Sequence, residues 1–173
     1  TACLLTFQQA GSVVSSETEP ACTASLGAVT MHRPWIAEND AERARLVALV
    51  TRLSDAELAL PMPAGWTVAA VLAHSAFWDA RVIQFLDKWE SGGAPASADR
   101  GTGETGNIDW INDTAKVLFL AMPPRDAARL AVTIAEAVDR RVAAMSDALV
   151  TQVQEIGGIV NLARADHRRE HLD

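Results

Sequence analysis

Apolar residues recur every three or four positions along most of the chain, which is the spacing that a helix with one buried face requires. Four or five helices are expected on this pattern, at about residues 36–53, 68–90, 109–122, 124–149 and 159–172. No segment alternates apolar and polar residues as a half-buried strand would, and no internal repeat stands out. The pattern therefore predicts an all-α fold.

Turn-forming residues separate the predicted helices. The run Pro-Met-Pro-Ala-Gly at residues 61–65 predicts a rigid turn, and Thr67 after it predicts an N-cap for the second helix. Pro123 ends the third helix, and Pro124 fits the first turn of the fourth. Residues 91–107, rich in Gly, Ala and Ser, predict a long flexible crossover. These breaks favour a four-helix bundle with one long connection.

Residues 1–30 differ from everything after them. They are rich in Ser, Thr and other small residues, contain no Lys or Arg, and show no sustained periodicity. Met31 opens the part of the chain with helical character. We therefore expect an N-terminal extension at 1–30 and a helical bundle domain at 31–173. The extension is either separate from the core or an ordered arm of it, and the pattern leaves both open.

Composition narrows the class of protein further. At 173 residues, with 49% hydrophobic and 21% charged residues, the chain suits one globular domain. Its net charge of −7 would repel phosphate groups, so we expect no nucleic-acid partner. No apolar run approaches the length of a membrane span, so we expect no membrane association.

The only two cysteines, Cys3 and Cys22, both lie in the N-terminal segment. They could pair with each other, but a disulfide confined to one end is a poor framework for a fold. The short apolar run near the start has no basic flank and is interrupted by Gln8 and Gln9, unlike a secretory signal. These features predict a reducing, cytoplasmic compartment.

Three of the four histidines fall where a buried helical face is expected. His74 lies on the flank of the apolar stripe of the second helix, where it is either a hydrogen-bonded core residue or a ligand. In the last helix, the stripe calls for apolar residues at the positions of His167 and His171. Their i, i+4 spacing puts both rings on one face, within reach of one ion. His32 is expected to be an exposed residue outside the bundle.

Together, His74, His167 and His171 predict a divalent metal site. Neutral imidazoles suit Zn²⁺, Ni²⁺ or Fe²⁺, and three protein ligands leave at least one coordination position open. An open position indicates a reactive site rather than a closed structural one. Left without a metal, buried imidazole nitrogens that have no partner would cost about 1–3 kcal/mol each. The alternative for the last helix is a frayed end with both rings in water.

Three runs of the sequence carry a family resemblance. Residues 53–61 read Leu-Ser-Asp-Ala-Glu-Leu-Ala-Leu-Pro, and residues 65–74 read Gly-Trp-Thr-Val-Ala-Ala-Val-Leu-Ala-His. Both resemble the first half of DinB-like proteins, most closely the mycothiol-dependent maleylpyruvate isomerase branch. Residues 167–171, His-Arg-Arg-Glu-His, resemble the C-terminal His-x-x-x-His helix of that superfamily. The similarity covers most of residues 36–173.

The resemblance implies a DinB-like four-helix bundle, a divalent metal on three histidines, and a homodimer. By motif match, the metal ligands are His74, His167 and His171. Members of known activity use low-molecular-weight thiols such as mycothiol or bacillithiol in transfer or isomerisation reactions. We therefore expect an enzyme that activates a thiol cosubstrate, or water, toward a small electrophilic substrate. The alternative is a non-catalytic small-molecule-binding or resistance protein with a structural metal.

Two other metal-site classes fit the sequence less well. His167 to His171 matches the inverted zinc-protease pattern His-x-x-Glu-His, but such enzymes need a further acidic ligand well downstream, and only Leu172 and Asp173 follow here. Glu170 is therefore expected on the outer face of its helix. A ferritin-like di-iron site needs two Glu-x-x-His motifs, and the sequence contains none.

Other polar and aromatic candidates are weaker. Asn112 could line the site, and Asp166 could orient a ligand histidine from behind. Trp66 and Trp78 could wall a pocket, although core packing is the usual role of such residues. Asp79 is expected either in solvent or at a helix interface. No residue stands out as a general base.

Overall fold

The computed structural model describes residues 31–93, 108–157 and 160–173. The extension expected at residues 1–30 lies outside the described residues. Of the crossover expected at 91–107, residues 94–107 also lie outside them. The fold described below is therefore that of the helical part of the chain.

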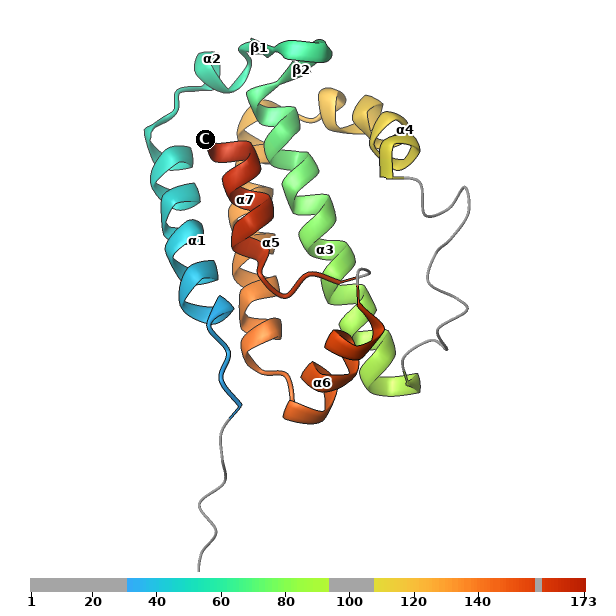
Figure 1. The fold of residues 1–173 in the computed structure, drawn as a ribbon. Coiled ribbons are helices and arrows are strands. Elements are labelled where there is room, and N and C mark those ends of the chain that lie inside the picture. The colour runs from blue at the N-terminus through green and yellow to red at the C-terminus, as the bar shows by residue number, and fades with distance from the viewer. Residues whose placement is uncertain (1–30, 94–107, 158–159) are drawn as a thin grey trace, which may run out of the picture. The chain divides into compact units, whose positions relative to one another are not determined.

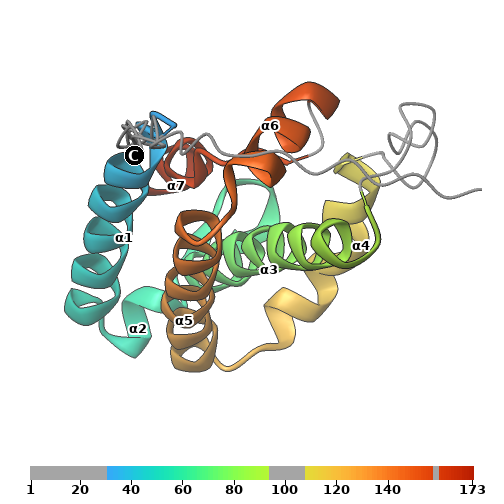
Figure 2. The same ribbon diagram turned by 90° about the horizontal axis from the view of Figure 1, so that it is seen from below.

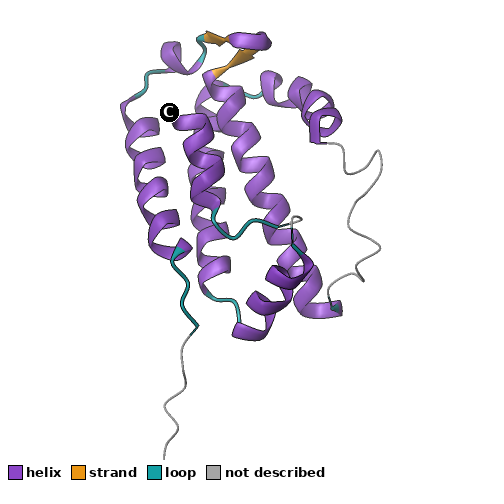
Figure 3. Ribbon diagram, viewed as in Figure 1, coloured by secondary structure: helices purple, strands orange, loops and turns teal. Residues whose placement is uncertain are grey.

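Helices make up most of the described residues (Figure 3). They are α1 (Trp35–Arg52), α2 (Asp55–Leu58), α3 (Val68–Gly92), α4 (Ile108–Ala121), α5 (Pro124–Ala143), α6 (Asp147–Ile156) and α7 (Arg164–Leu172). Between α2 and α3 lies a short antiparallel hairpin of β1 (Pro61–Met62), the 3-10 turn η1 (Pro63–Gly65) and β2 (Trp66–Thr67). The predicted all-α fold is confirmed, and the sequence pattern did not predict this small hairpin or the short helix α2.

Four helices, α1, α3, α5 and α7, run alongside one another and form the bundle (Figure 1). Helix α3 packs on α5, and α1 packs on both α5 and α7. Helix α4 packs on α3, on the side away from α1 (Figure 2). This arrangement brings α7, which is late in the sequence, next to the first half of α3.

Small side chains allow α3 and α5 to approach closely at one end of the bundle. The buried alanines there are Ala69, Ala70, Ala73 and Ala76 of α3, and Ala127, Ala128, Ala131 and Ala135 of α5. Further along the same two helices the core residues are larger, and they include Val82 and Leu86 opposite Val138 and Val142. Burial of these side chains is the main stabilising contribution to the bundle.

Two predicted helix boundaries are wrong. The helix predicted at 124–149 is two helices, because α5 ends at Ala143 and Ser146 caps α6 by accepting a hydrogen bond from the backbone N–H of Leu149 at 3.2 Å. The helix predicted at 159–172 begins only at Arg164, after Asn161 accepts the backbone N–H of Ala163. In both places a polar side chain takes the backbone donor that a continuous helix would have used.

The start of α3 agrees with the sequence prediction. The Thr67 hydroxyl accepts the backbone N–H of Ala70 at 3.1 Å, which is an N-cap contact. The turn before it contains Ala64 and Gly65 at φ of 57° and 72°, and the latter is a conformation that glycine adopts without strain. Helix α3 then continues to Gly92, two residues into the predicted crossover. None of the helices in the described ranges is both long and apolar enough to cross a membrane.

Candidate metal centre

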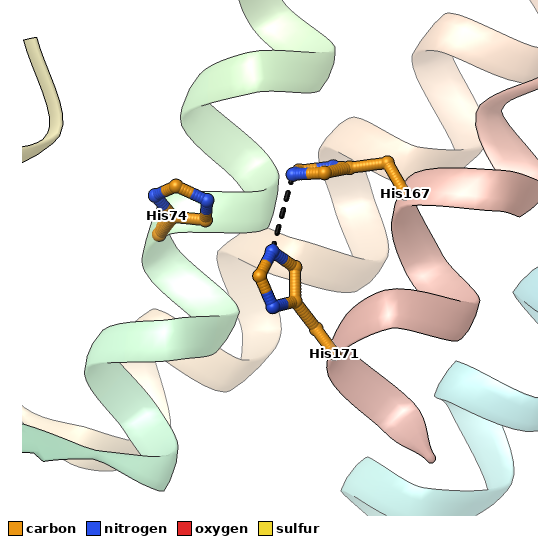
Figure 4. Close-up of side chains that lie close together, drawn as sticks. All are labelled: His74, His167 and His171. Carbon is orange, nitrogen blue, oxygen red and sulfur yellow. Dashed lines mark hydrogen bonds between the residues drawn. The ribbon is translucent and has the colours of Figure 1, made fainter. Parts of the chain in front are cut away.

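The structure brings together the three histidines singled out in the sequence. His74 projects from α3, and His167 and His171 project from α7 toward it (Figure 4). Each ring offers a nitrogen atom, and these three atoms all lie within 4.8 Å of one another. The Nε2 atoms of His167 and His171 are 3.2 Å apart. The fourth histidine, His32, is exposed, as expected.

Local structure explains why the rings meet. The i, i+4 spacing puts His167 and His171 on one side of α7, and their ring centroids are 4.7 Å apart. The centroid of the His74 ring lies 5.4 Å from that of His167 and 4.9 Å from that of His171. The last helix is therefore ordered against α3, and its histidines are partly buried rather than frayed into water.

Aromatic side chains surround His74 on its other sides. Trp66 lies edge-on at a centroid distance of 5.6 Å, Trp78 at 6.3 Å and Phe119 at 6.2 Å. His74 is only 7% exposed. The two tryptophans thus wall the site, and the apolar surroundings remove water from the His74 ring.

Burial keeps all three rings neutral at pH 7. Desolvation, with a smaller contribution from His171, lowers the pKa of His74 to about 4. Desolvation and the neighbouring Arg164 guanidinium lower the pKa of His167 to about 3, and desolvation also lowers the pKa of His171. Burial acts in this direction because it disfavours the charged imidazolium. Three neutral imidazoles converging on one point are the donor set that Zn²⁺, Ni²⁺ or Fe²⁺ prefers.

One ring nitrogen gives a further sign that the residues fit a metal ion. His74 Nδ1 is buried and has no hydrogen-bond partner among the described residues. An unsatisfied buried polar atom costs about 1–3 kcal/mol. Coordination of an ion by Nδ1 itself would compensate this cost.

A buried ion-pair network fixes α7 to the rest of the bundle. Asp79 of α3 accepts from Arg164 Nε at 2.7 Å and from Arg168 Nη2 at 3.1 Å. Arg168 also donates to both carboxylate oxygens of Asp139 on α5, each at 2.9 Å, and Arg43 of α1 pairs with the same carboxylate at 2.7 Å. The side chains of Arg164 and Arg168 are only 7% and 2% exposed. The network therefore sets the position of the helix that carries two of the histidines.

Asn39 of α1 holds the start of α7 in place. Its side-chain oxygen accepts the backbone N–H of Ala165 at 2.8 Å, and its Nδ2 donates to the carbonyl of Leu162 at 2.9 Å. Arg168 in turn donates to the Asn39 carbonyl at 3.1 Å. Because α7 has no side-chain N-cap of its own, Asn39 supplies this function from another helix.

Sequence reasoning missed these supporting residues. In the sequence, Arg164 and Arg168 stand among three acidic residues, Asp166, Glu170 and Asp173. Such a mixture of charges is typical of a helix surface exposed to solvent, so neither arginine stood out as a site residue. One signal was present, since Arg164 and Arg168 each precede a histidine by three positions and so share its helix face. Asp79 proves to lie at a helix interface, one of its two predicted places.

Two further candidates, Asp166 and Glu170, lie outside the histidine cluster. Asp166 contacts Arg169 and Asn161 at 3.2 and 3.3 Å, whereas His167 Nδ1 lies 3.3 Å from Arg164 Nη2. Orienting a ligand histidine, which the sequence left open for Asp166, is therefore not what its contacts show. Glu170 is exposed, as predicted for the outer face of its helix.

A pocket of about 880 Å³ opens beside the three histidines, which form part of its lining. Trp78, Ile108 and Asn112 form one wall, from α3 and α4. Asp166 and Glu170 of α7 line another part. The pocket is large enough for a small molecule and combines an apolar wall with a polar one.

Comparison with known families gives one result. The family model described as "Mycothiol maleylpyruvate isomerase N-terminal domain" matches residues 40–166, more than half of the chain. His74 lies inside the matched region, and His167 and His171 lie directly after it. Searches of curated proteins and of solved structures gave no match.

Proposed function

Because the chain belongs to the family of mycothiol maleylpyruvate isomerase N-terminal domains, which are DinB-like, we propose that it is a divalent-metal-dependent enzyme acting on a small electrophile. His74, His167 and His171 would hold one Zn²⁺, Ni²⁺ or Fe²⁺ ion. The cosubstrate is a low-molecular-weight thiol of the mycothiol or bacillithiol type, or water. The observation that carries this proposal is the convergence of three neutral imidazole rings, with donor atoms within 4.8 Å, at the edge of a pocket.

A divalent ion at this site would act as a Lewis acid and lower the pKa of a thiol or water bound beside it. The chain's own residues define what happens around the ion. The aromatic side chains of Trp66, Trp78 and Phe119 limit the access of water to His74. The pocket leaves room for both a thiol and a small electrophile, and the reaction is transfer of the thiol or isomerisation of its adduct.

The second candidate is a small-molecule-binding or resistance protein in which the metal only ties α7 to α3. One observation favours it. The carboxylates that line the pocket, Asp166 and Glu170, lie on the outer part of α7, and Asp166 is engaged with Arg169. Neither is placed as an evident general base for a catalytic cycle.

Metal content is the first measurement that tests the proposal. Protein purified without an affinity tag is expected to contain about one equivalent of Zn, Ni or Fe. The variants His74→Ala and His171→Ala are expected to lose it, because each ligand contributes about a quarter of the binding free energy of a four-coordinate site, or about a hundredfold in affinity. His32→Ala is the matched control and keeps the metal, since His32 lies outside the site. Absence of metal from the parent protein, even after reconstitution, would refute the metal site.

Turnover separates the enzyme from the binding protein. The metal-loaded protein is expected to accelerate the reaction of mycothiol or bacillithiol with chlorodinitrobenzene, in which the thiolate sulfur replaces chloride and forms a thioether. His171→Ala should bring the rate down to that of the uncatalysed reaction, and His32→Ala should not change it. The thiol is also offered a panel of chlorinated aromatics and epoxides. Saturable binding of the thiol, without thioether formation from any of these electrophiles, would favour the binding protein.

A further inference from the structure

The orientation of the Asn112 side chain follows from its contact with Trp78. The indole Nε1 of Trp78 lies 3.0 Å from Asn112 Oδ1. An indole N–H can only donate, so the atom facing it must be the amide oxygen. The amide NH₂ group of Asn112 is therefore turned away from Trp78. The two orientations of the amide, which differ by exchange of its oxygen and nitrogen, are not equivalent here, because only the oxygen can accept the indole N–H.

Trp78 is itself held in place, which makes the Asn112 amide a fixed group. The Arg81 guanidinium lies 5.4 Å from the centroid of the Trp78 ring, and the His74 ring lies edge-on to it at 6.3 Å. Asn112 and Trp78 line the same pocket as the three histidines. Throughout the described ranges, no hydrogen bond is made by Asn112 Nδ2. Within these ranges, the two N–H donors of this pocket-lining residue are therefore left without a protein acceptor.

The other polar side chains of the pocket are already engaged or are acceptors. The side-chain oxygen of Asn161 accepts the backbone N–H of Ala163, and its Nδ2 donates to Asp166. Arg164 is bound to Asp79 and also lies against the Asn161 carbonyl and His167. Asp166 and Glu170, when ionised, can only accept hydrogen bonds. Asn112 is therefore the lining side chain best placed to donate to a bound molecule.

From this arrangement we infer that Asn112 is a substrate-positioning residue, which donates a hydrogen bond to a carbonyl or amide oxygen of the molecule bound beside the histidines. The inference rests on the proposed function, because it assigns part of the substrate at that same site. It narrows the substrate class to small molecules that carry an oxygen acceptor in addition to the reacting group. The apolar side chains of Trp78 and Ile108 contact the rest of the molecule.

The test uses cobalt-loaded protein and pairs of thiols that differ only in an amide group. Mercaptoacetamide, mercaptopropionamide and mercaptobutyramide are each compared with the alkanethiol of the same chain length, by titrating the thiolate-to-cobalt absorption band. Asn112→Asp keeps an oxygen acceptor for Trp78 but replaces the NH₂ donors by a second oxygen. For at least one chain length, this variant is expected to lose about three- to tenfold of the preference for the amide, as one hydrogen bond would give. Asn112→Ala, which removes the donors without adding charge, should show the same loss.

Asn161→Asp is the matched control. It adds the same charge to the same pocket, but the Nδ2 that it removes is already bound to Asp166, so the preference for the amide should stay as in the parent. If cobalt and thiols bind normally and no chain length shows a selective loss in the Asn112 variants, the inference is wrong and the proposed function stands. If cobalt does not bind to the parent protein, both fail together.

Discussion

Replacing Asp79 by alanine is expected to lower the free energy of unfolding by about 3 to 5 kcal/mol, the usual cost of removing one partner from a buried ion pair. Asp79 is 2% exposed and accepts from both Arg164 and Arg168. Without it, the Arg164 guanidinium stays buried without a carboxylate, and Arg168 keeps Asp139 as its one carboxylate partner among the described residues. Urea denaturation of the metal-free protein, followed by circular dichroism, measures the change.

Asp87→Ala provides the control for this prediction. Asp87 lies on the same helix and pairs with Arg141, but its side chain is 54% exposed. Exposed pairs of this kind contribute about 0–1 kcal/mol, so the variant should be nearly as stable as the parent. Equal, small effects of both substitutions would contradict the importance assigned to the buried network. The Asp79 variant should also bind metal more weakly, because α7 then loses its ion pairs with α3.

The metal-free protein is expected to lose stability as the pH falls below about 6.5. His74 and His167 have pKa values of about 4 and about 3 in the folded chain, against 6.5 for an ordinary histidine. Between these values the unfolded chain binds more protons than the folded one, so stability rises with pH across this window and is complete above pH 6.5. Each histidine contributes a slope of at most about 1.4 kcal/mol per pH unit.

The measurement is a series of urea titrations between pH 7.5 and pH 4.5 with a chelator present. Carboxylates also titrate at the acid end, so the informative quantity is the difference between the parent and His167→Gln. The variant should show a shallower loss of stability from pH 6.5 downward, because one group with a lowered pKa has been removed. An unchanged slope would mean that the His167 ring is not desolvated as its surroundings indicate.

Local patterns were sufficient to predict most of the fold. The N-cap at Thr67 depends only on residues next to it, as does the pairing of His167 with His171, so both could be recognised without knowledge of the bundle. The break at Ser146 was missed because Met145 and Leu149 continue the apolar spacing of α5 through the turn. Both are buried, as apolar residues at helical spacing are expected to be. The pattern therefore identified the core but not the change of direction.

The environment of the site was harder to predict than the clustering of its three histidines. The burial of Asn39, Asp139 and Arg168 depends on contacts between residues far apart in sequence, and Arg168 and Asn39 are 129 positions apart. A charged residue in an amphipathic helix normally faces solvent, and nothing local marks those that do not. The sequence could likewise suggest Asn112 as a lining residue, but its free amide donors became evident only from the contact with Trp78.

The buried network also sets the order in which the protein can assemble during synthesis. Asp79 and Arg164 are 85 positions apart, and ribosomes add about 5–20 residues per second, so roughly 4 to 17 seconds separate their synthesis. Throughout that interval a nascent chain contains His74 but neither histidine of α7. Docking of α7 then completes the ion pairs and brings the three histidines together in the same step. If the three histidines hold an ion as proposed, its capture would wait until α7 has been synthesised, because the nascent chain offers only one of them.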